Sequence, residues 1–151
     1  MLIAGRGIEG IGLGTAQFAF RDGTAEDFVA TVRAALDAGV MLIDTALAYT
    51  RAGVESYAEQ IVARSLRGLM TGRPLVATKG GHWRRGDSFP VDGRPDTLRA
   101  HCEFSLRTLE TTGSTCTSCT TSILRCRCPI AWAPSGSCGR KARSRLSDCL
   151  T

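Results

Sequence analysis

An acid, a hydroxyl and a phenol follow one another closely at the end of a short apolar run. The run is residues 41–43, and Asp44, Thr45 and Tyr49 come directly after it. An apolar run of this kind is typical of a buried strand in a parallel sheet, and we expect this strand to cover residues 41–48. A carboxylate at its end needs a partner, because ionised groups are rarely buried alone. Barrel enzymes carry their catalytic groups at such strand ends, although a strand followed by a polar turn is the plainer interpretation.

Two other apolar runs end in the same way. The first, at residues 11–18, contains the pattern G-x-G-T, and the second, at residues 75–78, is followed by Lys79. Together the patterns G-x-G-T, L-I-D-T-A-x-x-Y and V-A-T-K-G resemble the aldo-keto reductase family in their order and spacing. The resemblance covers residues 8–109, and D-T-A-x-x-Y is its most specific part.

The resemblance implies an oxidoreductase that transfers a hydride between NADPH or NADH and a small carbonyl substrate. It implies that Tyr49 is the general acid, with Lys79 and Asp44 beside it. It also implies that Gly14, Thr15 and Asp44 contact the nicotinamide end of the cofactor, and it assigns no residue to a metal. The chemistry is coherent, because a phenol titrates near 10 in water and a nearby ammonium lowers that value.

The segments between the apolar runs predict helices. Apolar residues recur at helical spacing over residues 28–40, 54–69 and 98–109. Thr24 and Asp27 approximate a capping box before the first helix, and Pro95 suits the first turn of the third. Three strand–helix units in succession predict a parallel sheet with helices packed outside it. The fold class is therefore α/β, the incomplete N-terminal part of a (β/α)8 TIM barrel, with an irregular C-terminal tail.

Four smaller expectations concern the edges of this barrel. Residues 1–10 suit a small hairpin or an irregular lead-in. His82 and Trp83, in the loop at residues 80–93, either line a substrate pocket or have no role. His101 is interpreted as a surface residue of the third helix. No fourth strand is expected after the third helix, because the pattern of the sequence changes there.

The change divides the chain into residues 1–110 and residues 111–151. The first part has 13 basic and 13 acidic residues, so the net charge of +5 comes from the second. Six of the seven cysteines also lie in the second part, which we expect to be a disordered tail. A basic charge confined to this tail gives little reason to expect nucleic-acid binding. No apolar run is long enough to span a bilayer and no signal peptide is evident, so a cytoplasmic protein is expected.

The tail allows two interpretations beyond simple disorder. In one, Cys116, Cys119, Cys126 and Cys128 bind zinc, and the chain is a non-catalytic module. In the other, residues from about Glu110 onward are read in a shifted frame. The shift is either genuine, as in a pseudogene, or a sequencing error. Restoring one G near codons 109–110 allows L-G-D-H-R-I-D-L-H-Q-L-H-H-V-D-P-A-V-P-L over residues 109 to about 128. This reading resembles the fourth strand of the family and its histidine.

In the present frame that histidine is absent, and so are the later strands that bind most of the cofactor in the family. We therefore expect a truncated chain with little or no turnover. Three or four strands cannot close a barrel of eight, and the open edge predicts self-association.

Overall fold

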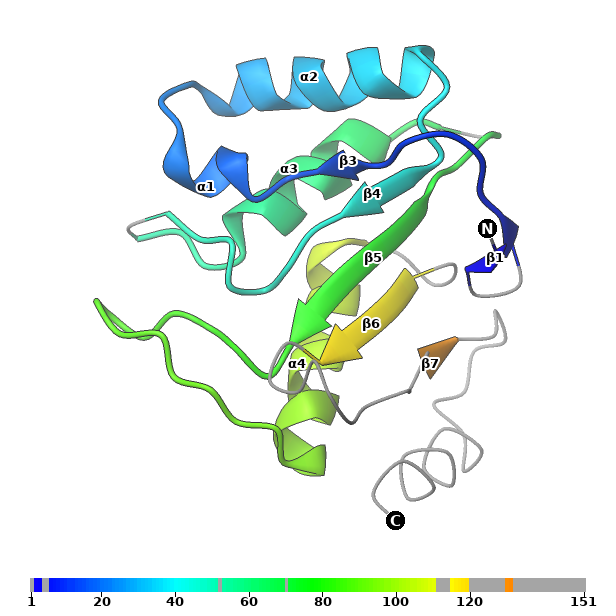
Figure 1. The fold of residues 1–151 in the computed structure, drawn as a ribbon. Helices are drawn as coiled ribbons and strands as arrows, with labels where there is room; N and C mark the ends of the chain where they lie inside the picture. The colour runs from blue at the N-terminus through cyan, green and yellow to red at the C-terminus, as the bar shows by residue number, and fades with distance from the viewer. Residues whose placement is uncertain are drawn as a thin grey trace.

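The computed structural model describes residues 2–3, 6–51, 53–69, 71–110, 115–119 and 130–131. Its centre is a five-stranded sheet in the order β3-β4-β5-β6-β7 (Figure 1). The strands are β3 (Leu13–Gly14), β4 (Leu42–Asp44), β5 (Leu75–Gly80), β6 (Thr115–Cys119) and β7 (Ile130–Ala131). The first four are parallel, and β7 pairs antiparallel with β6.

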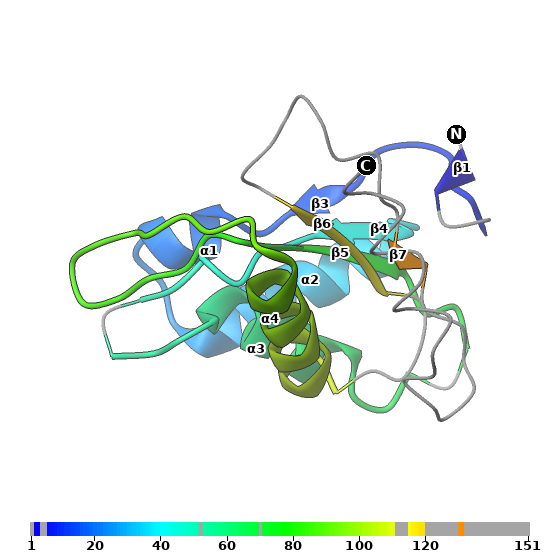
Figure 2. The same cartoon turned by 90° about the horizontal axis from the view of Figure 1, so that it is seen from below.

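The helices lie along one face of this sheet. They are α1 (Gln17–Phe20), α2 (Ala25–Asp37), α3 (Tyr57–Leu66) and α4 (Pro95–Thr108). Figure 2 shows α2, α3 and α4 together on the same side of the strands. This arrangement of parallel strands and crossover helices is the layout of a partial barrel wall, and it confirms the predicted fold class.

The core lies between the sheet and these helices. Ile43 of β4 and its strand partner Val76 of β5 are buried against α2 and α3. The helices bring Phe28, Val32, Ala58, Ile61, Val62 and Leu66 to the same cluster. Full burial of one such large apolar side chain contributes about 2 kcal/mol.

Two helix starts follow the local chemistry of the sequence. The hydroxyl of Thr24 accepts a hydrogen bond from the backbone N–H of Asp27 at 3.2 Å, and the Asp27 carboxylate accepts one from the Thr24 N–H at 2.9 Å. This is the predicted capping box, with Asp in the place of Glu. Pro95 occupies the start of α4, as predicted.

The N-terminal hairpin is also confirmed. β1 (Leu2–Ile3) pairs antiparallel with β2 (Arg6–Gly7). Figure 1 shows this hairpin at the far end of the sheet from the loops that follow β4 and β5. Those two loops therefore share one rim, at the C-terminal ends of the strands.

Four expectations about the elements need correction. The strand predicted over residues 11–18 is confined to β3, and residues 17–20 form α1 instead. The strand expected at 41–48 covers only Leu42–Asp44, and residues 47–48 form a turn. β5 continues two residues beyond Thr78, to Gly80.

The fourth correction concerns the tail. A strand, β6, follows α4 after all and pairs in parallel with β5 along its length. Within the tail, residues 115–119 and 130–131 lie in strands, and the expectation of disorder stays a prediction for the rest of it. Residues 111–114, 120–129 and 132–151 lie outside the described part of the chain.

Candidate active site

Adjacent strands bring Asp44 and Lys79 to one rim. Asp44 is the last residue of β4 and pairs with Ala77 of β5, so Lys79 lies two residues further along the neighbouring strand. The Lys79 Nζ donates to both carboxylate oxygens of Asp44 at 2.7 Å and to the carbonyl of Thr45, also at 2.7 Å. These acceptors satisfy the donors of the ammonium and fix its position.

Tyr49 approaches the same ammonium from the turn that follows β4. The Lys79 Nζ lies 5.1 Å from the centroid of the Tyr49 ring. The Tyr49 backbone is held at both of its polar groups, because its N–H donates to Ala46 at 3.1 Å and its carbonyl accepts from the N–H of Ala58 at 3.0 Å. Within the described part of the chain its hydroxyl has no hydrogen-bond partner, which leaves it available to an incoming group.

The three side chains predicted from the sequence are thus brought together. The Asp44 side chain is 48% exposed and that of Lys79 is 21% exposed, so the ion pair lies at the boundary between solvent and protein. Such a pair contributes little to stability. Its effect is to keep a positive charge beside the face of a phenol ring.

Of the two other predicted residues, Gly14 ends β3 and pairs with Asp44, and Thr15 follows it directly. The Thr15 N–H and hydroxyl both donate to the Asp44 carbonyl, at 2.9 and 3.0 Å. Thr15 is fully buried, so its side chain holds the end of β4 in place. Gly14 is exposed, and a Cβ added there would meet no atom within 4 Å. Its backbone therefore leaves an open surface beside the Asp44 carboxylate.

Arg51 secures the turn that carries Tyr49. Its guanidinium donates to three backbone carbonyls, those of Phe18, Arg21 and Gly23. It also stacks over the ring of Phe28, at 5.1 Å from the guanidinium carbon to the centroid. No spacing in the sequence pointed to this residue, because the carbonyls it binds are about thirty positions away.

A second carboxyl group, which sequence reasoning missed, lies behind the rim. Glu59 of α3 is fully buried, and hydroxyl groups of Ser56, Thr78 and Ser105 hydrogen bond to it. Burial raises the pKa of Glu59, and these hydrogen bonds partly oppose the increase. An acidic residue among Ala58, Ile61 and Val62 was the available signal, since charged residues are seldom fully buried without partners.

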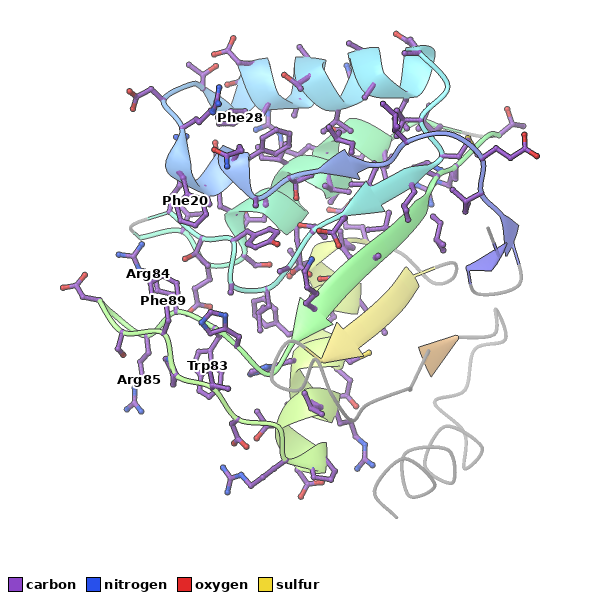
Figure 3. All side chains as sticks on the ribbon, viewed as in Figure 1. Phe20, Phe28, Trp83, Arg84, Arg85 and Phe89 are labelled. Atoms are coloured by element: carbon purple, nitrogen blue, oxygen red, sulfur yellow. The ribbon has the colours of Figure 1, made fainter. Side chains whose placement is uncertain are left out.

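Beside the rim, the loop after β5 covers a cavity of about 320 Å³. Trp83, Arg84, His101 and Phe104 are among its lining residues, and Figure 3 shows Trp83 and Arg84 projecting from this loop. The prediction of a pocket thus holds for Trp83, although its role in substrate binding stays a prediction. His82 does not line this cavity and packs near Phe89 instead.

The prediction of His101 as a surface residue is wrong. Its Nδ1 accepts a hydrogen bond from the Gly81 N–H at 3.0 Å, and its ring meets Trp83 edge to face. Burial lowers the pKa of His101, while the Asp92 carboxylate opposes the decrease. This residue therefore anchors the loop to α4.

Within the described residues no group of three or more His, Cys, Asp or Glu side chains could hold a metal ion. The side chains of the tail cysteines lie outside the described part, so the zinc hypothesis stays a prediction. None of the helices described is long and apolar enough to cross a membrane.

Comparison with known proteins gives one family. The sequence model of the aldo/keto reductase family matches residues 10–114. Among solved structures, a protein from Pseudomonas aeruginosa described as an aldo-keto reductase is 27% identical with a TM-score of 0.63, and the match covers 76% of this chain and 43% of that one. A glycerol dehydrogenase from Gluconobacter oxydans is 33% identical with a TM-score of 0.60, covering 72% of this chain and 34% of that one.

A more distant structure supports the fold alone. An aldo-keto reductase from Bacillus halodurans, in its holo form, is 20% identical with a TM-score of 0.64, and the match covers 76% of this chain and 37% of that one. No protein with a curated description matches the sequence. The matched region spans less than half the length of each of these three solved structures.

Proposed function

This chain belongs to the aldo/keto reductase family, and from that premise we propose that its rim of Tyr49, Lys79 and Asp44 is a carbonyl reductase site. The observation that carries the proposal is the position of the Lys79 ammonium. It bridges both carboxylate oxygens of Asp44 at 2.7 Å and lies over the Tyr49 ring. A purely stabilising ion pair does not require a neighbouring phenol. Here the pair adjoins Tyr49, whose hydroxyl has no hydrogen-bond partner among the described residues.

Each side chain has a distinct task in this proposal. The Tyr49 hydroxyl donates a proton to the carbonyl oxygen of the substrate as negative charge develops there. The Lys79 ammonium stabilises the phenolate that remains. Asp44 keeps the lysine charged and fixed in a partly dry site. A nicotinamide cofactor, NADPH or NADH, would supply the hydride for the carbonyl carbon when bound.

The residues beside Asp44 fit the nicotinamide end of such a cofactor. Gly14 presents bare backbone, with room where a side chain would stand. Thr15 holds the Asp44 carbonyl, which keeps the carboxylate at the edge of this open surface. A flat ring placed over Gly14 would therefore lie next to the charged groups of the rim. Thr15 serves the cofactor by positioning Asp44.

We further propose that the residues from about Glu110 onward come from a shifted reading frame. β6 lies beside β5 at residues 115–119, where the family has its fourth strand. The restored frame reads D-L-H-Q-L over the same five positions, and a histidine comes directly after them. The chain in its present frame lacks that histidine, so we expect little or no turnover from it.

The nucleotide sequence around codon 109 tests the frame, and a gene with the base restored tests the function. We expect the restored protein to oxidise NADPH in the presence of a simple aldehyde. Tyr49→Phe should lower kcat by about 10²- to 10⁴-fold, the usual contribution of a general acid. Tyr57→Phe is the matched control, because Tyr57 is the only other tyrosine and packs edge to face on Phe28.

One result would contradict the proposed role of Tyr49, and another would contradict the expected lack of turnover in the present frame. One is equal activity of Tyr49→Phe and Tyr57→Phe in the restored protein. The other is rapid aldehyde reduction by the 151-residue chain itself, which would show that the missing histidine is dispensable.

A further inference from the structure

Glu59 occupies a position where three structural elements meet. It belongs to α3, which packs against both α2 and α4 and covers the sheet. Its side chain is 0% exposed. A carboxyl group in such a place is expensive to bury unless hydrogen bonds compensate for the lost water. The hydrogen-bond partners of Glu59 therefore identify the elements that this side chain connects.

The hydrogen-bond partners come from three separate elements. Ser56 lies at the start of α3, Thr78 lies in β5, and Ser105 lies in α4. The hydroxyls of Ser56 and Thr78 donate to different oxygens of the carboxyl group, and Ser105 adds a third hydrogen bond. One side chain thus ties a helix start, a strand and a second helix together.

Two of these partners adjoin the residues of the rim. Thr78 is the strand neighbour of Lys79, and successive residues of a strand point to opposite faces. When Glu59 fixes Thr78 on the helix side, it also fixes the strand from which Lys79 projects on the other side. The two side chains are close enough for the Lys79 charge to lower the pKa of Glu59.

The link to Tyr49 passes through the start of α3. Ser56 has a φ of 52°, a left-handed conformation that is unfavourable for a residue with a side chain. Its hydrogen bond to Glu59 helps to hold that conformation. Two residues later the Ala58 N–H donates to the Tyr49 carbonyl at 3.0 Å. The conformation at Ser56 therefore sets where the Tyr49 turn meets the helix.

We propose that Glu59 is a positioning residue, which holds the Tyr49 turn and the Lys79 strand in register through its hydroxyl partners. The inference rests on the proposed function of that rim, because only a reactive site needs the phenol and the ammonium held together. Glu59 itself touches neither reacting group and acts through Ser56 and Thr78.

The test uses the position of Lys79 as its readout. The 151-residue chain has only two lysines, Lys79 and Lys141. A chain labelled with ¹³C-lysine should therefore give two Cε–Hε signals by NMR. The ring of Tyr49 should shift the Lys79 signal upfield, because the ammonium lies over that ring. Tyr49→Leu should remove this shift and so assign the signal.

We expect Glu59→Leu to remove the upfield shift, and Glu59→Gln to keep most of it. An amide has the same shape as the carboxyl group, and hydroxyls can rotate to donate to it or accept from it. Ser65→Ala is the matched control. Ser65 is buried on the same helix, but the partner of its hydroxyl among the described residues is the Ile61 carbonyl of that helix. This variant should lose some stability and keep the shift.

An unchanged Lys79 signal in folded Glu59→Leu would overturn the proposal, and so would equal loss of the shift in Ser65→Ala. If Glu59→Leu does not fold, Thr78→Val decides the case. It keeps the shape of the side chain and removes one hydroxyl donor, so the shift should decrease if the proposal is right and persist if it is wrong. The failure of the reductase proposal would appear separately, as absence of turnover in the restored protein with the Lys79 shift intact.

Discussion

Strand β5 separates two carboxyl groups that have opposite surroundings. On one face Lys79 holds Asp44, whose side chain is 48% exposed. On the other face Thr78 donates to Glu59, which is fully buried. Asp44 has a cation directly bonded to it, whereas the direct partners of Glu59 are hydroxyl groups. The carboxyl group on one side of the strand is therefore stabilised by a cation near solvent, and the one on the other side by hydroxyl groups in the core.

This difference in surroundings corresponds to a difference in role between a group that takes part in a reaction and a group that supports the fold. A charge that takes part in a reaction must reach the substrate, so the Asp44–Lys79 pair remains close to solvent and contributes little to folding. A group that holds elements in register gains from burial, because hydrogen bonds are worth more where water cannot compete. We infer that the helix face of β5 contributes stability and the rim face contributes reactivity.

The largest predicted effect on stability follows from removing the buried group. Glu59→Ala leaves three hydroxyls without their acceptor and creates a cavity in a packed core. Unsatisfied buried hydroxyls alone cost about 1 kcal/mol or more each, so the free energy of unfolding should decrease by about 3 kcal/mol. Urea denaturation would measure this. Glu103→Ala, at an exposed position on α4, should change little, and equal losses in both variants would contradict the inference.

A second prediction concerns pH and uses the same residue. Burial raises the pKa of Glu59 in the folded chain, so between the unfolded and folded pKa values the folded state binds more protons than the unfolded one. The contribution of Glu59 to stability is then fully present below the unfolded pKa and is lost as pH rises through the folded pKa.

Glu59→Gln has no proton to lose and should not show this decrease. As pH rises from 4.5, the ordinary pKa of a glutamate, the parent chain should lose stability relative to Glu59→Gln. The unfolding free energy of Glu59→Gln minus that of the parent chain should therefore increase with pH. Parallel pH profiles for the two proteins, measured by denaturation, would contradict the prediction.

The rim could be anticipated from the sequence because its residues lie at the ends of recognisable strands. The apolar runs before Asp44 and Lys79 and the helical spacing between them are local signals. They also set the parallel order of β4 and β5, which places strand ends side by side. The same local signals predicted the capping box at Thr24 and the start of α4 at Pro95.

The supporting side could not be anticipated, because it depends on which residues meet in space. Glu59, Ser105 and Thr78 lie on different elements, and only their packing brings them together. The strand predicted over residues 11–18 failed for a related reason. In the sequence, the apolar Phe18 resembled a buried strand residue. In the structure it belongs to α1, which buries it against Phe28 at 4.7 Å between ring centroids.

The smallest predicted effect on stability is on the rim face. Lys79→Met removes the cation from a half-exposed carboxylate that water can still solvate, so the unfolding free energy should change by about 0.5 kcal/mol. The exposed pair of Arg64 and Glu26 supplies the baseline, and Glu26→Gln should leave stability unchanged. In the restored-frame protein, however, Lys79→Met should abolish most aldehyde reduction, because the phenolate would lose its counter-charge. A loss of stability in Lys79→Met as large as that in Glu59→Ala would show that both faces of β5 support the fold. The division between a supporting face and a reactive face would then be wrong.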